Sequence, residues 1–317
     1  MTCGWPARPP EVRVRVVSVI FRAGDAVLRW NEALERSWRS FDAGSEDRLV
    51  VIAVDNASGD GTPDRLMRQA PGIELRRQVL NRGFAAGCNV GLASAEPGEL
   101  IVLLNPDVEV GQDFFAVLAT LDWPENLAAR GPAVRTPEGR VEQSARGFPR
   151  ASTGMFGRTS LLSKLLPESA AASRNLRADP HAGARTVDWV SGACMIVPTE
   201  RFERVGSFDE GYFMYWEDAD WCKRAHDLGF ETLYDPSLEV VHRQGASSAH
   251  RPVATTLSFH RSAWRYYDRH AASSRLVSCL AAVALLGLSM GKVLIGVGRR
   301  AVGTGRPFRS SVSAPDQ

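Results

Sequence analysis

Strand patterns alternate with segments of helical spacing over the first third of this chain. Residues 49–54 and 100–104 are continuous apolar runs, residues 12–21 alternate and then run apolar, residues 73–79 predict a further strand, and the helical patterns lie at 26–39 and 84–95. Strands that are apolar throughout are typical of a parallel sheet covered by helices on both faces. The pattern therefore predicts an α/β fold with a mostly parallel sheet flanked by helices.

The second half of the chain alternates less regularly. Residues 136–186 predict loops with short elements, and the expected elements after them are strands at 187–197, 231–234 and 238–241 and helices at 199–205, 217–228 and 251–270. At roughly 150 residues per domain, 317 residues allow two domains, or one large α/β unit with an appendage.

The formal net charge of +2 conceals an uneven distribution. Residues 243–317 hold eleven Lys and Arg and two acids, a net charge of +9, so residues 1–242 carry −7. We infer an acidic body joined to a basic tail.

Several familiar motifs are missing from the sequence. It contains no G-x-G-x-x-G after the first expected strand, no G-x-x-x-x-G-K-[ST] and no H-E-x-x-H. These absences disfavour a nicotinamide-binding domain, a P-loop ATPase and a zinc protease. The five cysteines form no C-x-x-C pair, which favours a reducing compartment.

Polar side chains follow two of the expected strands where each strand ends. Asp55 and Asn56 follow one strand, and Asn105 and Asp107 follow another. Ligands of open parallel sheets bind beyond the carboxyl ends of the strands. A carboxylate there can accept from a nucleobase or a ribose, or can hold Mg²⁺ or Mn²⁺ together with substrate phosphates. The alternative is that these residues only form turns or helix caps.

A glycine-rich segment opens the helix expected at 84–95. Gly83, Gly87 and Gly91 recur at a spacing of four, and Asn81 and Asn89 lie among them. Glycines allow a ligand to approach the backbone closely, and a helix N-terminus favours an anion. Tight packing of a helix made of small residues would also explain the pattern.

An aromatic run leads into three acids at the start of a helix, in residues 208–221. Glu217, Asp218 and Asp220 there suit the positive end of a helix dipole, but a carboxylate beside aromatic walls also suits a general base. His242 ends a short strand and is either a ligand of a metal or phosphate, or a structural histidine. Together these segments indicate direct displacement on a nucleotide-bearing donor.

The same segments resemble the family-2 inverting glycosyltransferases with the A-type nucleotide-sugar fold, and most closely their bacterial rhamnosyltransferase branch. The resemblance covers residues 12–245 and rests on V-D-N-A-S-G-D-G-T at 54–62, N-R-G-F-A-A-G-C-N-x-G at 81–91, L-L-N-P-D-V at 103–108, D-W-V-S-G-A at 188–193, G-x-F-D-E-x-Y-F-M-Y-W-E-D-A-D at 206–220 and V-V-H at 240–242. Any one motif is weak, whereas six in this order are specific.

The resemblance implies a role for each matching residue. The expected nucleotide-sugar-binding residues are Asp55, Asn56, Asn81, Gly83, Asn89, Asn105, Trp189, Ser191 and Gly192. Asp218 matches the general base, with Glu217 as the alternative, and Asp107 and His242 match ligands of Mg²⁺ or Mn²⁺.

Two positions depart from the family pattern. Asn105 stands where the family usually has the first Asp of its metal motif, so Asp107 is the expected direct ligand. Arg22 stands where the first strand typically ends in Tyr-Asn, and it either contacts donor phosphate or signals a changed donor preference.

The C-terminal part predicts a membrane-directed helical tail. We expect an extension at 1–11, a catalytic domain at 12–245, a basic helical segment at 246–275, an apolar helix at 276–298 and a disordered basic tail at 299–317. The apolar helix is long enough to span a bilayer, but its glycines and Lys292 also suit an interfacial helix or a soluble core helix. Flanking arginines favour the cytoplasmic face of the cell membrane.

The expected donor is dTDP-rhamnose, with a UDP- or GDP-sugar as the alternative, and the expected acceptor is a polyprenyl-linked glycan.

A catalytically inactive family member that binds glycans or scaffolds other proteins at the membrane is a competing hypothesis. A nucleotidyltransferase is disfavoured because no basic glycine-rich loop follows the first strand. Nucleic acid is not an expected partner, since the arginines flank an apolar helix. Nothing in the sequence indicates an oligomeric state.

Overall fold

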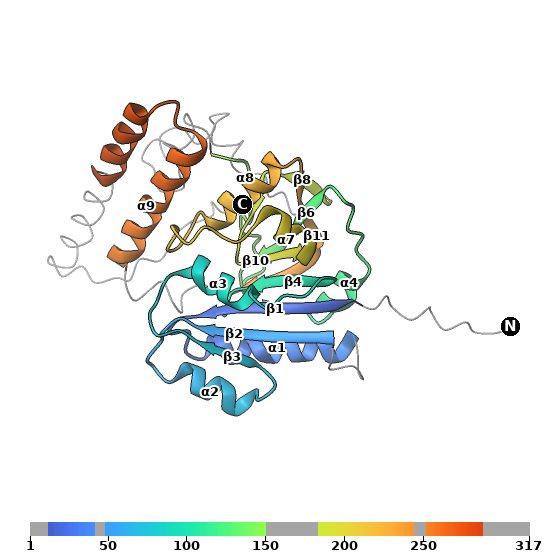
Figure 1. Ribbon diagram of the computed structural model, residues 1–317. Helices are drawn as coiled ribbons and strands as arrows, with labels where there is room; N and C mark the ends of the chain where they lie inside the picture. The colour runs from blue at the N-terminus through green and yellow to red at the C-terminus, as the bar shows by residue number, and fades with distance from the viewer. Residues whose placement is uncertain (1–11, 42–47, 150–182, 244–251, 288–317) are drawn as a thin grey trace, which may run out of the picture.

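A nine-stranded sheet runs through the part of the chain that the structure describes, with helices on both of its faces (Figure 1). The structure is a computed structural model, and it describes residues 12–41, 48–149, 183–243 and 252–287. The strands follow the order β3-β2-β1-β4-β10-β6-β11-β5, and β8 pairs with β11 outside this path.

The first half of the chain alternates as its sequence predicts. Its elements are β1 (Arg13–Ile20), α1 (Ala26–Phe41), β2 (Leu49–Asp55), α2 (Thr62–Gln69), β3 (Glu74–Arg77), α3 (Phe84–Leu92) and β4 (Glu99–Leu104). β1 pairs in parallel with both β2 and β4, and β2 pairs in parallel with β3. The prediction of a parallel sheet in an α/β fold is confirmed for this half.

The second half adds antiparallel strands to the same sheet. Its elements are β5 (Val108–Val110), α4 (Phe114–Ala119), β6 (Leu127–Arg135), β7 (Ala145–Arg146), β8 (Arg185–Val187), β9 (Trp189–Val190), β10 (Cys194–Pro198), α7 (Thr199–Val205), α8 (Glu217–Asp227), β11 (Glu231–His242) and α9 (Pro252–His270). β11 is parallel to β6, but β10 is antiparallel to both β4 and β6, and β5 is antiparallel to β11. The sheet as a whole is therefore mixed.

Two strand predictions in this half are wrong in their boundaries. The expected strand at 187–197 is three strands, β8, β9 and β10, and β9 pairs with β7 in a separate two-stranded sheet. The expected strands at 231–234 and 238–241 are the single strand β11, whose pairing with β6 shifts between Asp235 and Glu239. A run of apolar residues, or an interruption in such a run, does not by itself show where a strand ends or with which strand it pairs.

Side chains of β1 alternate between two apolar cores. Val16 and Ile20 pack in the core that contains α1 and α4, while Val17 and Val19 pack in the core that contains α3 and α8. This alternation follows from the two-residue period of a strand. Figure 1 shows α1 and α2 on one side of the sheet, with α3 and α8 on the other. The result is a three-layer α/β/α arrangement.

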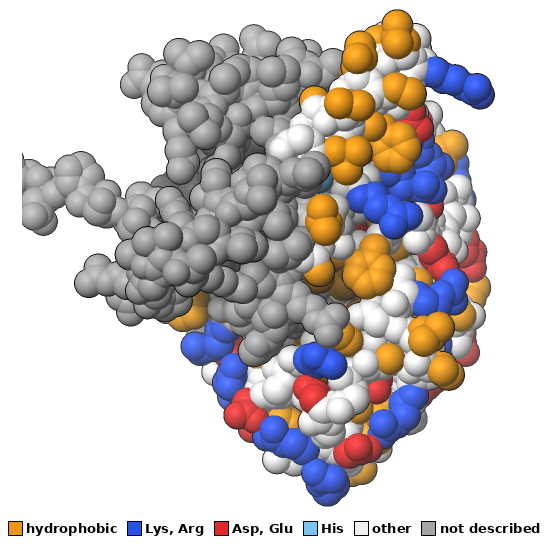
Figure 2. Space-filling model, turned by 90° about the vertical axis from the view of Figure 1, so that its left-hand side faces the viewer, with side chains coloured by type: hydrophobic (Ala, Val, Ile, Leu, Met, Phe, Trp, Pro, Cys, Tyr) orange, Lys and Arg blue, Asp and Glu red, His pale blue; other side chains and the backbone are white. Residues whose placement is uncertain are grey.

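The C-terminal helices extend the protein beyond the sheet. α9 is followed by a helix over residues 275–287, and the Trp264 indole N–H donates to the main-chain oxygen of Ser278 over 3.2 Å. Leu276, Leu280 and Val283 on the second helix are mostly exposed. Figure 2 shows hydrophobic side chains gathered in the region where these helices lie in Figure 1.

The membrane-spanning alternative finds no support in the described residues. No helix among them combines the length and the apolar character needed to cross a bilayer. Residues 288–298 of the expected apolar helix lie outside the described part of the chain, as do the segments 1–11 and 299–317.

A buried ion pair ties β1 to β4 at the amino ends of the two strands. The Arg15 guanidinium donates to both carboxylate oxygens of Glu99, over 2.6 and 3.1 Å, and both residues are buried. Glu99 also accepts from the main-chain N–H of Glu96 over 2.9 Å. Removal of one partner from such a pair leaves an uncompensated buried charge.

We therefore predict that Glu99→Gln lowers the free energy of unfolding by about 3 kcal/mol, because the Arg15 charge stays buried without its counterion. Urea unfolding of the full chain measures this change. The matched control is Glu35→Gln, which removes the exposed pair with Arg39 on α1 and should cost less than about 1 kcal/mol. Equal losses in the two variants would contradict the prediction.

Candidate active site

Asp55 and Asn56 lie where β2 leaves the sheet, and both are buried. Asp55 Oδ1 accepts from the main-chain N–H of Ser58 over 3.0 Å, so this carboxylate shapes the loop after β2. The main-chain N–H of Asn56 donates to Ile20 O at the end of β1 over 2.8 Å. The carboxyl ends of the parallel strands β1 and β2 thus lie side by side at one edge of the sheet.

Asn56 holds the glycine-rich segment against this edge. Its amide nitrogen donates to Asn81 Oδ1 over 3.0 Å and to Gly83 O over 2.9 Å, and its Oδ1 accepts from the Arg82 N–H over 3.2 Å. Asn81 Oδ1 also accepts from the Gly83 N–H over 2.9 Å. Asn56 and Asn81 are therefore joined in one network, and direct contact between them and a donor stays a prediction.

Gly83 requires a glycine for two separate reasons. Its φ is +94°, and a Cβ there would lie 2.2 Å from Phe213 O. The same oxygen accepts from the Phe84 N–H over 2.7 Å at the start of α3. The glycine thus lets the loop that carries Phe213 close onto the N-terminus of α3.

Asn89 fixes the same loop from the side of α3. Its side chain donates to Phe208 O over 2.9 Å and accepts from the Phe208 N–H over 3.0 Å, and it also donates to Glu210 Oε1 over 3.1 Å. These contacts make Asn89 a structural anchor for the loop, and its expected contact with the donor stays a prediction.

Arg22 has a left-handed backbone, with φ of 51°. Its main-chain N–H donates to Ser58 Oγ over 3.1 Å, its Nε donates to Ser58 O over 3.2 Å, and its guanidinium lies 5.4 Å from the Phe21 ring centroid. Arg22 therefore braces the loop after β2 at the edge of the site. Its predicted contact with donor phosphate stays a prediction.

Asp107 and His242 lie together although they are far apart in the sequence. β5 and β11 pair with His242 opposite Val108, which brings His242 Nε2 to 3.5 Å from Asp107 Oδ1. The other ring nitrogen lies 3.1 Å from Glu142 Oε2. Burial alone would lower the pKa of His242, but the carboxylates of Asp107 and Glu142 outweigh it and raise the pKa to about 9.

The donor set at this position suits Mg²⁺ or Mn²⁺ completed by a substrate. Asp107 offers carboxylate oxygen and His242 imidazole nitrogen, and Asn105 Oδ1 is buried with no hydrogen-bond partner among the described residues. Within that part of the chain, no group of three or more His, Cys, Asp and Glu side chains is arranged to hold a metal ion. A site of few protein ligands is usual for cations that share substrate phosphates.

Residues 191–193 connect three parts of the site. Asn105 donates its main-chain N–H to Ala193 O over 3.0 Å, and Ser191 donates its main-chain N–H to Ser144 O over 2.8 Å. The Gly192 N–H donates to Asp218 Oδ2 over 2.9 Å. This segment therefore brings the residue after β4 and the acidic start of α8 to the same place.

Trp189 and Arg146 lie on the two short strands next to this segment. The Trp189 indole N–H donates to Gly147 O over 3.1 Å, and the Arg146 guanidinium lies 5.3 Å from the Trp189 ring centroid. Trp189 therefore lies beside Ser191 and Gly192, and the expected contact of these residues with the nucleotide sugar stays a prediction.

Glu217 and Asp218, the carboxylate pair, begin α8. Burial raises the pKa of Asp218, although the N–H groups of Gly192 and Ala219 and the charge of Arg146 oppose the shift. Burial and the neighbouring Asp218 charge raise the pKa of Glu217 well above its ordinary value. Glu217 Oε2 has no hydrogen-bond partner within the described residues. Two carboxyl groups of raised pKa side by side are suited to proton transfer.

Two residues near the site were missed by the sequence analysis. Glu142 binds His242, and Arg146 contributes positive charge near Asp218. Both lie in the region 136–186 that we expected to be loops, and no motif marks them. Only the pairing of β7 with β9 brings Arg146 opposite Trp189.

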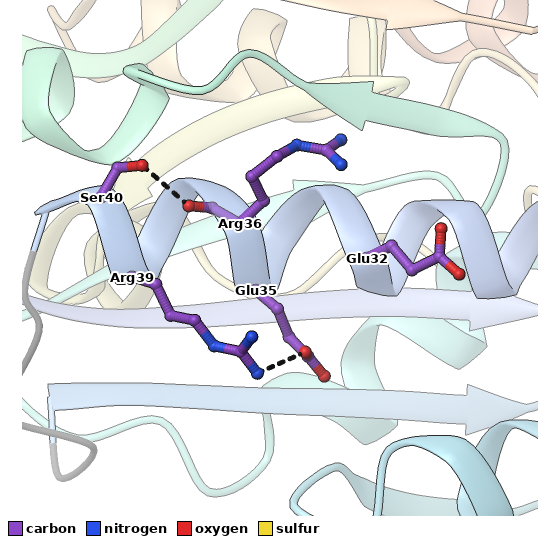
Figure 3. Close-up of a pocket in the computed structure, with 5 residues that line it drawn as sticks. All are labelled: Glu32, Glu35, Arg36, Arg39 and Ser40. Atoms are coloured by element: carbon purple, nitrogen blue, oxygen red, sulfur yellow. Dashed lines mark hydrogen bonds and ion pairs between the residues drawn. The ribbon is translucent and has the colours of Figure 1, made fainter.

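A surface cavity lies elsewhere on the protein. It has a volume of about 480 Å³ and is lined by Glu32, Glu35, Arg36, Arg39 and Ser40 on α1 (Figure 3). α1 begins near the edge where β1 ends and runs back toward the opposite edge, so these residues lie away from the strand ends that carry the site. The cavity is separate from the candidate active site.

Comparisons of sequence identify relatives of this chain. The family described as glycosyl transferase family 2 matches residues 27–155. An N-acetylglucosaminyl-diphospho-decaprenol L-rhamnosyltransferase of Mycobacterium tuberculosis is 33% identical over 252 residues, which cover 75% of this chain and 80% of that protein. The dTDP-rhamnosyl transferase RfbF of Shigella flexneri is 25% identical, over 70% of this chain and 69% of its own.

Solved structures share the fold at low sequence identity. A mannosyltransferase of Pyrobaculum calidifontis in complex with GDP-Man and Mn²⁺ has a TM-score of 0.52 and 18% identity, over 97% of this chain and 86% of that one. GalNAc-T7 with UDP, GalNAc and Mn²⁺ has a TM-score of 0.57 and 14% identity, over 81% of this chain and 48% of that one. The family match and the 33% identical rhamnosyltransferase show that this chain belongs to glycosyltransferase family 2 and is a glycosyltransferase, and the solved structures show that it has the A-type fold.

Proposed function

We propose that this enzyme transfers L-rhamnose from dTDP-rhamnose to a hydroxyl group of a polyprenyl-linked glycan, with inversion at the anomeric carbon. The names of two relatives support the sugar and the acceptor class: one is a dTDP-rhamnosyl transferase, and the other is an L-rhamnosyltransferase named for a decaprenol-linked substrate. A UDP- or GDP-sugar is the alternative donor, since structures with the same fold hold UDP and GDP-Man.

The hydrogen bond from Gly192 to Asp218 is the observation that carries the proposed mechanism. It fixes the carboxylate pair beside a segment that is also bonded to Asn105, two residues before Asp107. A proton acceptor and a binding place for a diphosphate therefore flank the same three residues, 191–193. A single displacement needs this division, because the acceptor and the leaving group occupy opposite sides of the anomeric carbon.

Asp218 is the proposed general base. Burial raises its pKa, so the carboxylate binds a proton more readily than an exposed aspartate does. The two N–H groups that it accepts from, those of Gly192 and Ala219, hold it in one orientation. In this proposal Asp218 takes the proton of the acceptor hydroxyl as that oxygen attacks the sugar, and the bond to the nucleoside diphosphate breaks.

Asp107 and His242 are the proposed holders of Mg²⁺ or Mn²⁺, with Asn105 Oδ1 beside them. A bound cation would neutralise the charge that develops on the leaving diphosphate. Glu142 orients the His242 ring through the other nitrogen, as carboxylates commonly do for histidine ligands.

The nucleoside is proposed to lie at the ends of β1 and β2. Asp55 is placed there to accept from the base or the ribose, and the network of Asn56, Asn81 and Gly83 supports the pocket wall. Arg22 braces the loop at its entrance.

We also propose that the enzyme works at the cytoplasmic face of the cell membrane. A polyprenyl-linked acceptor lies in the membrane, and the exposed apolar stripe of Leu276, Leu280 and Val283 suits an interfacial helix. Arg275 at the start of that helix suits anionic headgroups.

We predict that Asp218→Asn lowers turnover at least about 100-fold, because the amide cannot accept the acceptor proton. The binding constant for dTDP-rhamnose should change less than about 3-fold, since the base acts on the acceptor. Rapid-quench assays and calorimetry measure the two quantities. Asp227→Asn, an exposed position on the same helix, is the matched control and should keep full turnover. Undiminished turnover in Asp218→Asn would overturn the assignment.

Removal of the cation should stop the reaction. We predict that EDTA abolishes transfer, that Mn²⁺ or Mg²⁺ restores it, and that Asp107→Ala lowers turnover at least about 10-fold and weakens Mn²⁺-dependent binding of dTDP. Asp113→Ala, an exposed carboxylate a few residues further on, is the control. Equal Mn²⁺ dependence of dTDP binding in the two variants would contradict the metal assignment.

A donor panel tests the proposed sugar and nucleotide. We predict that dTDP-rhamnose with Mn²⁺ raises the melting temperature more than UDP- or GDP-sugars do, because a ligand stabilises the fold in proportion to its affinity. Proton NMR of the product should show the inverted anomer. Donor binding without transfer to any polyprenyl-linked acceptor would favour the inactive, glycan-binding alternative.

A further inference from the structure

The carboxylate pair follows a strained turn. Tyr215 and Trp216 both have left-handed backbones, with φ of 70° and 74°. Bulky residues rarely adopt this conformation, and each instance costs roughly 1–3 kcal/mol unless surrounding contacts impose it. The position of Glu217 and Asp218 thus depends on whatever holds this turn.

Part of the support comes from α3. Phe213 O accepts from the Phe84 N–H over 2.7 Å, and the glycine at position 83 leaves room for that contact. This contact lies on one side of the loop and precedes the strained residues, so it does not by itself fix them.

The other side of the turn is covered by α9. The Phe259 ring lies 5.7 Å from that of Tyr215 and 5.8 Å from that of Trp216, and the Tyr266 ring lies 5.2 Å from that of Trp216, all between ring centroids. Such edge-on and tilted aromatic pairs add stabilisation beyond the area that they bury. In addition, Ser262 Oγ donates to the main-chain oxygen of Met214 over 2.9 Å.

A buried charge network joins the end of α9 to the first turn of α8. Asp220 is fully buried, and its carboxylate meets His270 Nε2 at 2.7 Å, Arg224 Nε at 2.9 Å and the Tyr212 hydroxyl at 3.2 Å. Burial alone would raise the pKa of Asp220, but His270 and Arg224 outweigh it and lower the pKa. The carboxylate is therefore charged and only accepts, so His270 Nε2 carries the proton and donates.

The start of the same loop is tied to α9 as well. Arg265 Nη2 donates to Asp209 Oδ2 over 2.8 Å, and Arg269 Nη1 donates to the same oxygen over 2.7 Å. The segment 209–220 is thus held by α9 at its beginning, at its strained turn and at its end. Simple burial of an apolar helix face does not require three polar attachments to one loop.

We propose that α9 positions the general base: through the hydrogen bond from His270 to Asp220 and the packing of Phe259 and Tyr266 on the turn at 215–216, it holds the carboxylate pair in its reactive orientation. This inference rests on the proposed role of Asp218. His270 and Phe259 are positioning residues, since they act on the substrate only through Asp218.

The consequence is a selective loss of turnover. Among the described residues, neither His270 nor Phe259 contacts the residues at the ends of β1, β2 and β4, so we expect donor affinity to be independent of them. Displacement of a catalytic group by about 1 Å lowers the rate by up to about 100-fold. A purely structural helix would instead lower stability and leave the turnover of the folded enzyme unchanged.

The test uses His270→Ala and His270→Gln in the full chain. We expect His270→Ala to lower kcat at least about 10-fold while donor binding changes less than about 2-fold. His270→Gln should recover most of the lost kcat, because its amide nitrogen can donate to Asp220 from nearly the same place. Unchanged kcat per folded molecule in His270→Ala, or a Gln variant as slow as the Ala variant, would overturn the proposal.

Trp264→Phe provides the matched control on α9. It removes the bonds to Ser278 on the next helix and none to the loop, so it should lower the melting temperature and keep kcat. A fall of kcat in this variant equal to that in His270→Ala would show a general effect of helix stability and would overturn the proposal.

Phe259→Ala covers the case in which His270→Ala does not fold. Phe259 is 39% exposed, so its truncation leaves the buried core intact. We expect kcat to fall about 5-fold with donor binding unchanged, and an unchanged kcat would overturn the packing part of the proposal. Asp218→Asn is measured in parallel: if that variant retains full turnover the proposed function fails, whereas if it is slow and the α9 variants are fast only this inference fails.

Discussion

The antiparallel course of β10 is the constraint on which the site depends. Because β10 runs against β4, the residues that precede it arrive at the carboxyl edge of the sheet, where Asn105 donates to Ala193 O. The segment 191–193 is thereby placed between the end of β4 and the start of α8. In a wholly parallel sheet the start of β10 would lie at the opposite edge, and Gly192 would have no access to Asp218. The proposed mechanism therefore depends on the mixed sheet.

Three acids in four residues acquire different electrostatic states. Burial alone would raise the pKa of Asp220, but His270, Arg224 and Arg269 outweigh it and lower the pKa. Glu217 is buried and Asp218 is half-buried, and among the described residues neither contacts a cation of comparable strength, so their pKa values rise. The helix dipole acts on all three and therefore cannot separate them. Contacts with residues of other elements thus make Asp220 an anchor for α9, while Glu217 and Asp218 remain available for proton transfer.

The sequence predicts most of the parallel half because β2 and β4 contain continuous apolar runs and because strand patterns alternate with helical patterns there. It does not predict the division of residues 187–197, since Asp188 and the Ser191-Gly192 step do not by themselves show that β8, β9 and β10 pair with different strands. The contact of His242 with Glu142 joins residues 100 positions apart and arises from the pairing of β11 with its neighbours. Motifs identify Asp107, Asp218 and His242, but their partners follow from topology, which local patterns do not encode.

The fold also changes the interpretation of the uneven charge between residues 1–242, the acidic body, and residues 243–317, the basic tail. Arg265 and Arg269 of α9 point their charge at Asp209, so part of the positive charge of the tail neutralises the acidic body within one molecule. These arginines are therefore poor candidates for contact with lipid headgroups. Among the described helices, the one at 275–287, which Trp264 joins to α9, keeps Arg275 and exposed apolar side chains for contact with a membrane. Since α9 also covers the turn before Asp218, the same helix pair would link the proposed approach of a lipid-borne acceptor to the proposed general base.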